Sequence, residues 1–455
     1  MRRTNPWTSR SLPKKNVLGR SSVPAQCGVR NRLPCARPAL RHWRLAARLL
    51  KSSVVRRPNR CANPPRDPVP RRPCGVQCRG RLSSNPCKGR QPMRLVVTGG
   101  GTGGHVYPAL EVALGAQRRE WNVQYFGSIR GQEGDACQRV GLRFTAFASE
   151  PVYSLKTFRG LRALVRLYQA SLQAGKALRR EGAEAVFATG GYSSAPVLQA
   201  AQRLGIPTVL HEQNAVPGRT QQLMSKRAAA VCTVFAEAES HFPGARVVRT
   251  GMPVRKALRD SAQGRLFEEG ISHSAPVVLV MGGSQGSAAL NDVALTCAAR
   301  MARSEVQWIH VTGPKHYEET LASSNKLAIK SDYSVRPYLQ EDDLAAALFS
   351  CAVCVSRAGA GTLAELAAFR KPSILVPFPS AFGDHQTRNA SEFVEMGAAE
   401  LIPQSELTPA GLEVRILKWL SDADAARHAR EALAQWDRPD ATELVLDEIQ
   451  RAVTA

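Results

Sequence analysis

From Met93 onward, short apolar runs rich in valine, phenylalanine and threonine alternate with longer stretches whose apolar residues recur at helical spacing. The apolar runs predict strands at 94–98, 122–127, 184–188, 207–211, 229–234 and 246–250. The stretches between them predict helices at 107–118, 161–180, 195–204 and 218–226. Regular alternation of strand and helix is typical of a parallel, doubly wound α/β sheet.

A second series of strands begins after a stretch punctuated by proline and glycine at 251–275. Its apolar runs are "PVVLVMGGSQGS", "VQWIHVTG", "AVCVSRAGAGT" and "PSILVPFP". We therefore predict two α/β domains in tandem, at 93–255 and 256–437, followed by a helical segment at 438–455. No apolar run reaches the roughly 18 residues of a transmembrane helix, so the sequence predicts none.

The charge of the chain is concentrated in its first fifth. The formal net charge of +25 would suit a nucleic-acid-binding protein if it were spread evenly. Residues 1–92, however, contain 23 Lys and Arg against a single acid, Asp67, whereas the rest of the chain has 39 against 36. This segment also holds 13 of the 29 prolines and six of the 11 cysteines. Because it can bury little apolar surface, we expect residues 1–92 to be a disordered basic extension.

Three interpretations of this extension stay open. An organelle transit peptide would share its arginine-rich, acid-poor composition. A zinc-binding or nucleic-acid-binding tail would want paired CxxC spacing, whereas Cys74 and Cys78 form only CxxxC. The third interpretation, which we favour, is that upstream sequence is translated from a start codon placed too early, since Met93 directly precedes the first strand. The fold would then begin at Met93, and no nucleic-acid partner would be expected.

Glycine-rich loops follow several of the predicted strands. Gly99, Gly101 and Gly104 satisfy the GxGxxG pattern between a strand and a helix, as in dinucleotide-binding folds. The second predicted strand nevertheless ends in Ser128 rather than in an acid that could hold a ribose, and no lysine completes a GxxxxGK[ST] loop. These departures disfavour an enzyme of hydride transfer.

Four glycine-rich loops of this kind occur along the chain. The loops are "GGGTGGH" at 99–105, "TGGYSSAP" at 189–196, "GGSQGSAAL" at 282–290 and "RAGAGTLAE" at 357–365. Each could be a tight turn and nothing more. Glycine nevertheless lets backbone N–H groups approach an anion at a helix N-terminus. Loops of this kind at the carboxyl ends of strands in two domains predict a cleft that holds phosphates from both sides.

Polar side chains near these loops suit a nucleotide sugar. Glu365 comes one helical turn after the last loop, where a carboxylate could hold a ribose diol; the alternative is that it complements the helix dipole. Asp384, His385 and Gln386, together with "HEQN" at 211–214, offer donors and acceptors for sugar hydroxyls.

In their order and spacing, these motifs resemble the MurG family of bacterial N-acetylglucosaminyltransferases. The shared segments are "GGTGGHVYPAL", "GGYSSAP", "VLHEQNAVPG", "MPVR", "VMGGSQGS", "SRAGAGTLAELAAFRKPSILVPFP" and "DHQTRNA". The resemblance runs from Met93 to the end of the chain. It implies a GT-B fold, in which two Rossmann-like domains face each other across a cleft and the segment 438–455 packs back on the first domain. The two-domain frame alone would fit any GT-B glycosyltransferase, so one with a different sugar nucleotide or lipid acceptor is the alternative.

The resemblance also implies a site for the donor UDP-N-acetylglucosamine, held mainly by the second domain. Matched position by position, the donor-binding residues would be Thr102, Gly103, Gly104, Asn214, Arg255, Ser284, Ala360, Gly361, Thr362, Leu363, Ala364, Glu365 and Gln386. The candidates for binding the acceptor diphosphate are Gly190, Gly191, Ser193 and Ser194. Met252 stands where the family usually has asparagine, which leaves the reach of Arg255 open.

The implied reaction moves N-acetylglucosamine to the 4-hydroxyl of N-acetylmuramoyl-pentapeptide on undecaprenyl diphosphate, with inversion at the anomeric carbon. His105 is the candidate base, because a neutral imidazole can accept a proton; it could equally orient a ligand or cap the loop. The N–H groups of the glycine loops could stabilise the departing UDP. No chelating pair of carboxylates stands out, so we expect neither a metal ion nor another cofactor.

This acceptor lies in a membrane, and the segment from Pro151 to Arg180 contains no acid. Its basic residues are Lys156, Arg159, Arg162, Arg166, Lys176, Arg179 and Arg180, and they interleave with Leu155, Phe158, Leu161, Leu164, Leu167 and Tyr168. A basic amphipathic stretch suits an anionic membrane surface, although its apolar stripe could instead pack inward. We therefore expect a peripheral protein at the cytoplasmic face of the bacterial inner membrane.

Two other signals are better explained by the protein core. Cys351 and Cys354 spell CxxC, but they border a predicted strand and are expected to be small buried side chains rather than a metal or redox pair. His310, inside "QWIHVTG", is likewise expected in the core.

Overall fold

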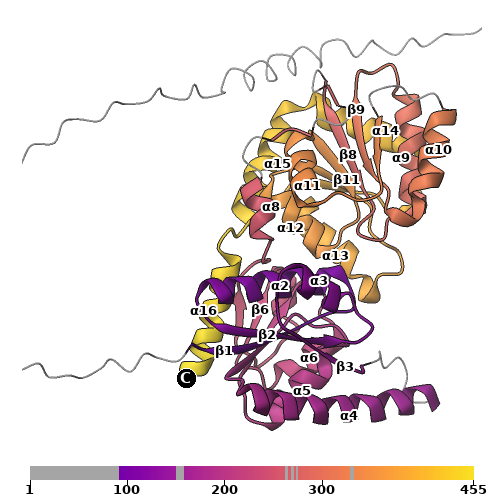
Figure 1. Cartoon of the computed structure of the whole chain (residues 1–455). Helices are drawn as coiled ribbons and strands as arrows, with labels where there is room; N and C mark the ends of the chain where they lie inside the picture. The colour runs from indigo at the N-terminus through magenta and orange to yellow at the C-terminus, as the bar shows by residue number, and fades with distance from the viewer. Residues whose placement is uncertain (1–91, 150–157, 262–264, 268–270, 273–274, 328–332) are drawn as a thin grey trace, which may run out of the picture. The chain divides into compact units, whose positions relative to one another are not determined.

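The structure is a computed structural model that describes residues 92–149, 158–261, 265–267, 271–272, 275–327 and 333–455. The expectations for the basic extension, apart from its last residue, lie outside the described residues, as do those for 150–157. The described chain forms two parallel sheets covered by helices, as the alternating pattern predicts (Figure 1).

The first sheet has seven parallel strands in the order β3-β2-β1-β4-β5-β6-β7. Their bounds are β1 Arg94–Thr98, β2 Asn122–Ser128, β3 Phe144–Phe147, β4 Ala185–Ala188, β5 Thr208–Glu212, β6 Ala230–Thr233 and β7 Val247–Arg249. The accompanying helices are α2 Gly103–Arg118, α3 Glu133–Arg139, α4 Phe158–Glu181, α5 Ala195–Arg203, α6 Arg219–Ser225 and α7 Ala236–Glu239. The strand order reverses between β1 and β4, and open sheets of this kind bind ligands beyond the carboxyl ends of the strands at such a point.

The second sheet has six parallel strands in the order β10-β9-β8-β11-β12-β13. The strands are β8 Val277–Met281, β9 Gln307–Val311, β10 Tyr333–Arg336, β11 Val353–Ser356, β12 Ser373–Leu375 and β13 Ala399–Leu401. Its helices are α8 Lys256–Ser261, α9 Ala288–Arg300, η1 Pro314–His316, α10 Tyr317–Lys326, α11 Glu341–Ser350, α12 Ala360–Ala368, η2 Phe382–Asp384, α13 His385–Glu395, η3 Gln404–Glu406, α14 Pro409–Ser421 and α15 Ala423–Trp436. The last helix of the chain, α16 Ala441–Thr454, returns to the first sheet. In the second sheet the order reverses between β8 and β11, and a glycine loop follows each of these two strands.

Successive residues of β1 point to opposite faces of the first sheet, and each face has its own core. Leu95 and Val97 pack in a cluster that includes residues of α2 and α3, whereas Val96 packs in a second cluster with residues of α4 and α5. Both faces are therefore apolar, which explains why β1 appears in the sequence as a continuous apolar run.

The last helix of the chain, α16, completes the core of the first sheet. Val445, Leu446 and Ile449 are fully buried in the cluster on the α2 face. The approach is close, because a Cβ atom at Gly115 of α2 would lie 2.7 Å from the side chain of Thr442.

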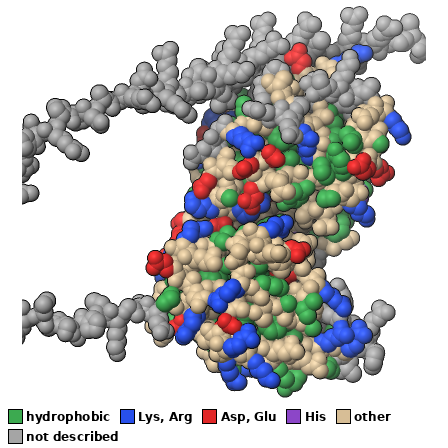
Figure 2. All heavy atoms as spheres, viewed as in Figure 1, with side chains coloured by type: hydrophobic (Ala, Val, Ile, Leu, Met, Phe, Trp, Pro, Cys, Tyr) green, Lys and Arg blue, Asp and Glu red, His purple; other side chains and the backbone are tan. Residues whose placement is uncertain are grey.

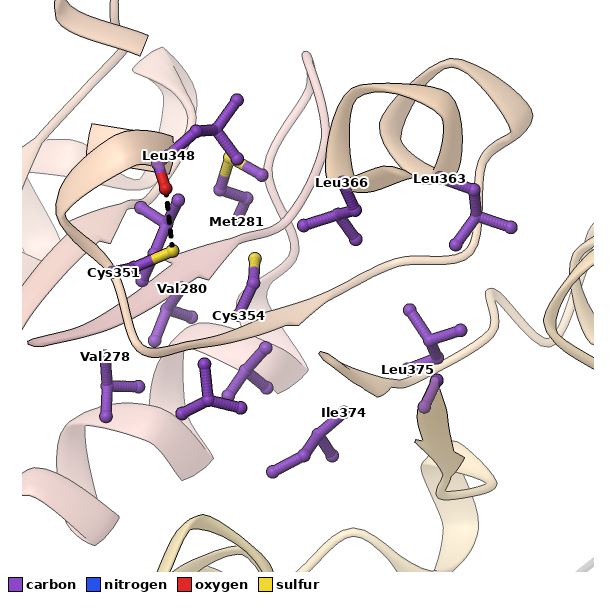
Figure 3. Close-up of a cluster of buried hydrophobic side chains, with 14 of the residues drawn as sticks. Val278, Val280, Met281, Leu348, Cys351, Cys354, Leu363, Leu366, Ile374 and Leu375 are labelled. Carbon is purple, nitrogen blue, oxygen red and sulfur yellow. Dashed lines mark hydrogen bonds between the residues drawn. The ribbon is translucent and has the colours of Figure 1, made fainter. Parts of the chain in front are cut away.

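A third core fills the second half of the chain, and part of it is drawn in Figure 3. Cys351 and Cys354 lie within it as free thiols, and burial raises the pKa of both. The Cys351 thiol donates to the carbonyl oxygen of Leu348 at 3.4 Å (Figure 3). His310 is also fully buried, where it contacts Asn291 and Tyr333, and burial lowers its pKa to about 3. The expectation that these three residues belong to the core is confirmed.

Two helices begin several residues before their predicted starts, α4 at Phe158 rather than at residue 161 and, with the larger difference, α2. The helix expected at 107–118 begins at Gly103, four residues earlier. Gly103 and Gly104 form its first turn but carry no side chains, so they leave no apolar period in the sequence from which a helix start could be predicted.

Candidate functional site

The glycine loops after β1 and β4 touch each other at the point where the strand order reverses. The N–H of Gly100 donates to the carbonyl oxygen of Gly190 at 3.3 Å. A Cβ atom at Gly191 would lie 2.1 Å from the carbonyl oxygen of Gly100, and Gly191 has a φ of +81°. Only glycine fits there without displacing the facing backbone. The two loops thus form one continuous surface of main-chain groups.

Helix α2 opens onto this surface. Thr102 is its N-cap residue, but the side chain makes no capping hydrogen bond, and the first intrahelical bonds run from His105 and Val106 to the Thr102 carbonyl. The N–H groups of Gly103 and Gly104 therefore have no intrahelical partner, as at the start of any α-helix. Thr102 and Gly104 are exposed. This end of α2 has the features of an anion-binding helix N-terminus.

The two serines proposed for the acceptor diphosphate do not present their hydroxyls to solvent. Ser193 and Ser194 are 1% and 0% exposed. The Ser194 hydroxyl donates to the Gly191 carbonyl at 2.9 Å, and within the described residues the Ser193 hydroxyl has no partner. Gly190 is also buried, so any anion held by this loop would meet the main chain of the partly exposed Gly191 rather than these side chains.

His105 is held between the two glycine loops and β5. Its Nδ1 atom lies 2.9 Å from the carbonyl oxygen of Thr189 and 2.9 Å from Oε1 of Gln213. The Thr189 hydroxyl donates in turn to the carbonyl of His105 at 2.7 Å. Burial lowers the pKa of His105 below its usual value of 6.5, against the opposing effect of the two hydrogen bonds. The imidazole is therefore neutral near neutral pH.

The segment "HEQN" was expected to offer partners to sugar hydroxyls, but most of its side chains are buried. His211, Glu212 and Gln213 are 0%, 1% and 2% exposed, because the first two end β5, an interior strand of the sheet, and Gln213 follows directly. Only Asn214 is partly exposed. The first three side chains are bonded inside the protein, so they can act on a ligand only through other groups.

Glu212 fastens the loop that follows β5. Its Oε1 atom accepts from the N–H of Asn214 at 3.0 Å, and its Oε2 atom accepts from the N–H of Gly218 at 3.2 Å. Burial raises the pKa of this carboxyl group to about 7, although the N–H donors lower it. The loop reaches α13, where Ala215 donates to Asn389 at 2.8 Å and Asn389 donates to the Asn214 side chain at 3.2 Å. Asn214 thus lies at a contact between the first-sheet and second-sheet halves of the chain.

In the second half of the chain, the glycine loop after β8 presents Ser284. Gly283 and Gly286 take positive φ angles and close a turn by a 2.9 Å hydrogen bond, which leaves Ser284 exposed. Ser287 then caps α9 by accepting from the N–H of Leu290. The predicted donor-binding serine is therefore accessible, directly before a helix N-terminus.

Arg357, a residue without an assigned role in the sequence, ties this loop to its neighbours. It is 7% exposed and donates to Ser287 at 2.6 Å, to the carbonyls of Val376 and Pro377 at 3.0 Å, and to Gln404 at 2.6 Å. Each of these acceptors is an uncharged oxygen, and burial lowers the pKa of the guanidinium. The charge therefore adds a positive potential where two helices, α9 and α12, begin.

Helix α12 divides the predicted run 360–365 into two groups. Ala360, Leu363 and Ala364 are buried in the core, so their side chains are not accessible to a ligand. Gly361, Thr362 and Glu365 are partly exposed. On the neighbouring α13, Gln386 is also partly exposed, and its Oε1 atom accepts from the N–H of Phe378 at 2.9 Å.

Arg255 joins the two halves of the site. It lies in the connection between β7 and β8, donates to Oε1 of Glu365 at 2.9 Å and to Glu341 at 3.1 Å, and stacks over the ring of Tyr107 at 5.0 Å. Burial lowers the pKa of its guanidinium, but the two carboxylates raise the pKa by more than burial lowers it, so the net change is an increase. Arg255 and Glu365, each predicted separately for the donor site, are thus brought together. Tyr107 and Glu341 were missed, because only the fold shows that they flank Arg255.

Two family models match the chain, in the same order as the two sheets. The glycosyltransferase family 28 N-terminal domain matches residues 95–233, and the glycosyltransferase family 28 C-terminal domain matches residues 277–445.

Curated relatives cover the chain from the first sheet to its end. The chain is 37% identical over 367 residues to a protein of an Exiguobacterium species, which covers 78% of this chain and 99% of the relative. It is also 37% identical to a protein of Desulforudis audaxviator, over 79% of this chain and 98% of the relative. Both are named UDP-N-acetylglucosamine--N-acetylmuramyl-(pentapeptide) pyrophosphoryl-undecaprenol N-acetylglucosamine transferase.

Among solved structures, the chain is similar to the crystal structure of Acinetobacter baumannii MurG. The TM-score is 0.63 at 29% identity, over 79% of this chain and 100% of that chain. The expectation of two Rossmann-like domains in a GT-B arrangement is confirmed.

Proposed function

The chain belongs to glycosyltransferase family 28, and on that premise we propose that it transfers N-acetylglucosamine from UDP-N-acetylglucosamine to the 4-hydroxyl of N-acetylmuramoyl-pentapeptide on undecaprenyl diphosphate. The names of the relatives support this pair of substrates, and the match extends over nearly the full length of those relatives. The product would be a lipid-linked disaccharide precursor of peptidoglycan. A different sugar nucleotide or lipid acceptor is the alternative.

The observation that carries the donor assignment is the Arg255–Glu365 pair at the first turns of α12. Arg255 donates a hydrogen bond to Oε1 of Glu365, and within the described residues Oε2 of Glu365 has no hydrogen-bond partner. That oxygen can accept from a ribose diol while the N-termini of α9 and α12 hold the diphosphate. Ser284 and Gln386 complete the proposed donor site from the two adjoining segments.

The proposed chemistry is a single displacement with inversion. His105 takes the proton of the acceptor hydroxyl on Nε2, the hydroxyl oxygen forms a bond to the anomeric carbon, and the bond from that carbon to the β-phosphate oxygen breaks. The electron pair of the broken bond leaves with UDP, whose charge the loop N–H groups stabilise. The lowered pKa of His105 supports this role, because the unprotonated imidazole predominates at neutral pH.

The surface of α4 supports a peripheral position on an anionic membrane. Leu164, Val165, Tyr168 and Leu172 are between 44% and 52% exposed, whereas the buried side of α4 carries alanines and Leu178. Figure 2 shows Lys and Arg side chains along the edge where Figure 1 places α4. Exposed apolar residues flanked by basic ones favour contact with lipid over inward packing. No helix within the described residues is long and apolar enough to cross a membrane.

The test is transfer of radiolabelled N-acetylglucosamine from its UDP conjugate to a lipid-linked muramoyl acceptor. We expect transfer by the intact chain, a fall in kcat of about 10²- to 10⁴-fold for His105→Ala, and weakened donor binding for Glu365→Ala. Glu413→Ala, which removes a carboxylate paired with Arg300 between α9 and α14, is the control and should retain activity. Transfer only from another sugar nucleotide, or only to another acceptor, would favour the alternative.

A further inference from the structure

We propose that Gln213 and His211 are positioning residues, which form a buried hydrogen-bond relay that fixes the proton of His105 on Nδ1 and leaves Nε2 unprotonated. This inference rests on the proposed function only for its use of His105 as the base. The relay itself follows from four hydrogen bonds and the donor and acceptor character of the groups in them.

The relay starts at a hydrogen bond whose donor and acceptor are unambiguous. The carbonyl oxygen of Gly251, which can only accept, lies 3.0 Å from Nε2 of His211. Nε2 of His211 must therefore carry the proton. A neutral imidazole has one N–H, so its Nδ1 atom must accept. Burial lowers the pKa of His211 to about 4, which keeps the ring neutral.

The acceptor at Nδ1 of His211 then fixes the orientation of the Gln213 side-chain amide. Its amide nitrogen lies 3.0 Å from Nδ1 of His211 and 2.7 Å from the carbonyl oxygen of His211, both of which are acceptors. The amide group can face them only with its NH₂ end. Oε1 of Gln213 is consequently the atom that lies 2.9 Å from Nδ1 of His105. An amide oxygen only accepts, so Nδ1 of His105 donates.

His105 and His211 therefore hold opposite tautomers, and the side chain of Gln213 bridges their rings. The carbonyl oxygen of Thr189 is a second acceptor at Nδ1 of His105 and favours the same tautomer. Nε2 of His105 has no hydrogen-bond partner within the described residues, so its lone pair is free for the acceptor hydroxyl. Gly251, at which the relay starts, lies in the connection between the two sheets.

The charged groups around His105 do not replace the relay. His385 on α13 lowers the pKa of His105, and His105 lowers the pKa of His211, because each ring disfavours a second positive charge nearby. These charges influence when a ring gains a second proton, but they do not select the nitrogen of His105 that carries the first. That selection requires an oriented acceptor at Nδ1, which Gln213 supplies.

The decisive measurement is the tautomer of each histidine, read from the ¹⁵N signals of the full chain labelled at its nine histidines. Variants in which single histidines are replaced would assign the signals. We expect His105 to show a protonated Nδ1 and an unprotonated Nε2, and His211 to show the reverse. The same tautomer in both residues, or a proton on Nε2 of His105, would overturn the proposal. Because this readout needs no substrate, it stands even if the chain transfers no sugar to the lipid acceptor.

Variants of Gln213 test the consequence for the reaction. Gln213→Leu should lower kcat about tenfold while leaving the KM for UDP-N-acetylglucosamine unchanged, because one of two acceptors at Nδ1 is lost. Gln213→Glu keeps an acceptor at Nδ1 of His105 and should move the acidic limb of the kcat profile upward, because a carboxylate there favours the protonated ring. It should not restore kcat fully, because its second oxygen faces the two acceptors of His211. Gln221→Leu is the matched control, since Gln221 is equally buried and donates to the His211 carbonyl but touches neither ring. An equal loss in Gln221→Leu, or full kcat in Gln213→Leu, would refute the positioning role.

Discussion

Glu212 gives the sharpest prediction, because a buried carboxyl group holds the loop that carries Asn214. Its pKa is raised from 4.5 to about 7, chiefly by burial. The folded state therefore keeps the proton that the unfolded chain gives up above pH 4.5. A raised carboxyl pKa contributes stability that is fully present below pH 4.5 and is lost as the pH rises through about 7.

The magnitude follows from the two pKa values. The difference between 4.5 and about 7 corresponds to about 3 kcal/mol, at about 1.4 kcal/mol per pKa unit. Glu212→Gln removes this dependence on pH. The amide keeps an oxygen toward Asn214 but turns its NH₂ toward the N–H of Gly218, which adds a cost that is the same at every pH.

Urea unfolding of the intact chain and of Glu212→Gln, followed by circular dichroism, measures the effect. The difference in unfolding free energy between the two proteins should move by about 3 kcal/mol in favour of the variant, from below pH 4.5 to above pH 7. Other titrating groups cancel in this difference. A difference that stays constant across this range would show that Glu212 titrates normally and that its burial does not control its charge.

Three further predictions test separate parts of the site. Gly191→Ala places a methyl group 2.1 Å from a loop carbonyl at a φ of +81°, whereas Gly205→Ala has a φ of +71° and open space. Strain alone costs about 1–3 kcal/mol, so the thermal midpoint should fall further for Gly191→Ala, and equal shifts would contradict the loop contact. Arg255→Ala removes the partner that orients Glu365, so the dissociation constant for UDP measured by calorimetry should rise about tenfold; an unchanged constant would exclude this role. Charge reversal of both Arg179 and Arg180 should weaken binding to anionic vesicles in a flotation assay, at about 1 kcal/mol of binding free energy per charge. Unaltered flotation would show that this end of α4 does not contact the membrane.

The sequence predicted the strands that carry the glycine loops because those strands are buried on both faces. The strands without a prediction were β3, β10 and β13, and each lies at an edge of its sheet. They have only three or four residues, several of them half-exposed. Such short runs show neither a continuous apolar pattern nor a clear alternation, so periodicity cannot separate them from loops.

The site was predictable where a local pattern forces a geometry. A strand, a glycine loop and a helix start are adjacent in the chain, so the loops at 99–105 and 357–365 could be recognised directly. The roles of Gln213 and Arg357 depend instead on partners far away in the sequence. Gln213 bonds to a histidine 108 residues away, and Arg357 to a serine 70 residues away. Nothing in the spacing of either residue indicates such partners.

Helix α16 has a consequence for how the protein is made. A ribosome delivers Leu95 and Val97 early and Val445, Leu446 and Ile449 last, yet all five belong to one cluster. Helices α2 and α3 can cover their part of this face early, but the part beneath α16 stays open to water until translation is almost finished. The nascent first half cannot reach its final packing alone, and a message truncated before residue 441 would release a product with that part of the core uncovered.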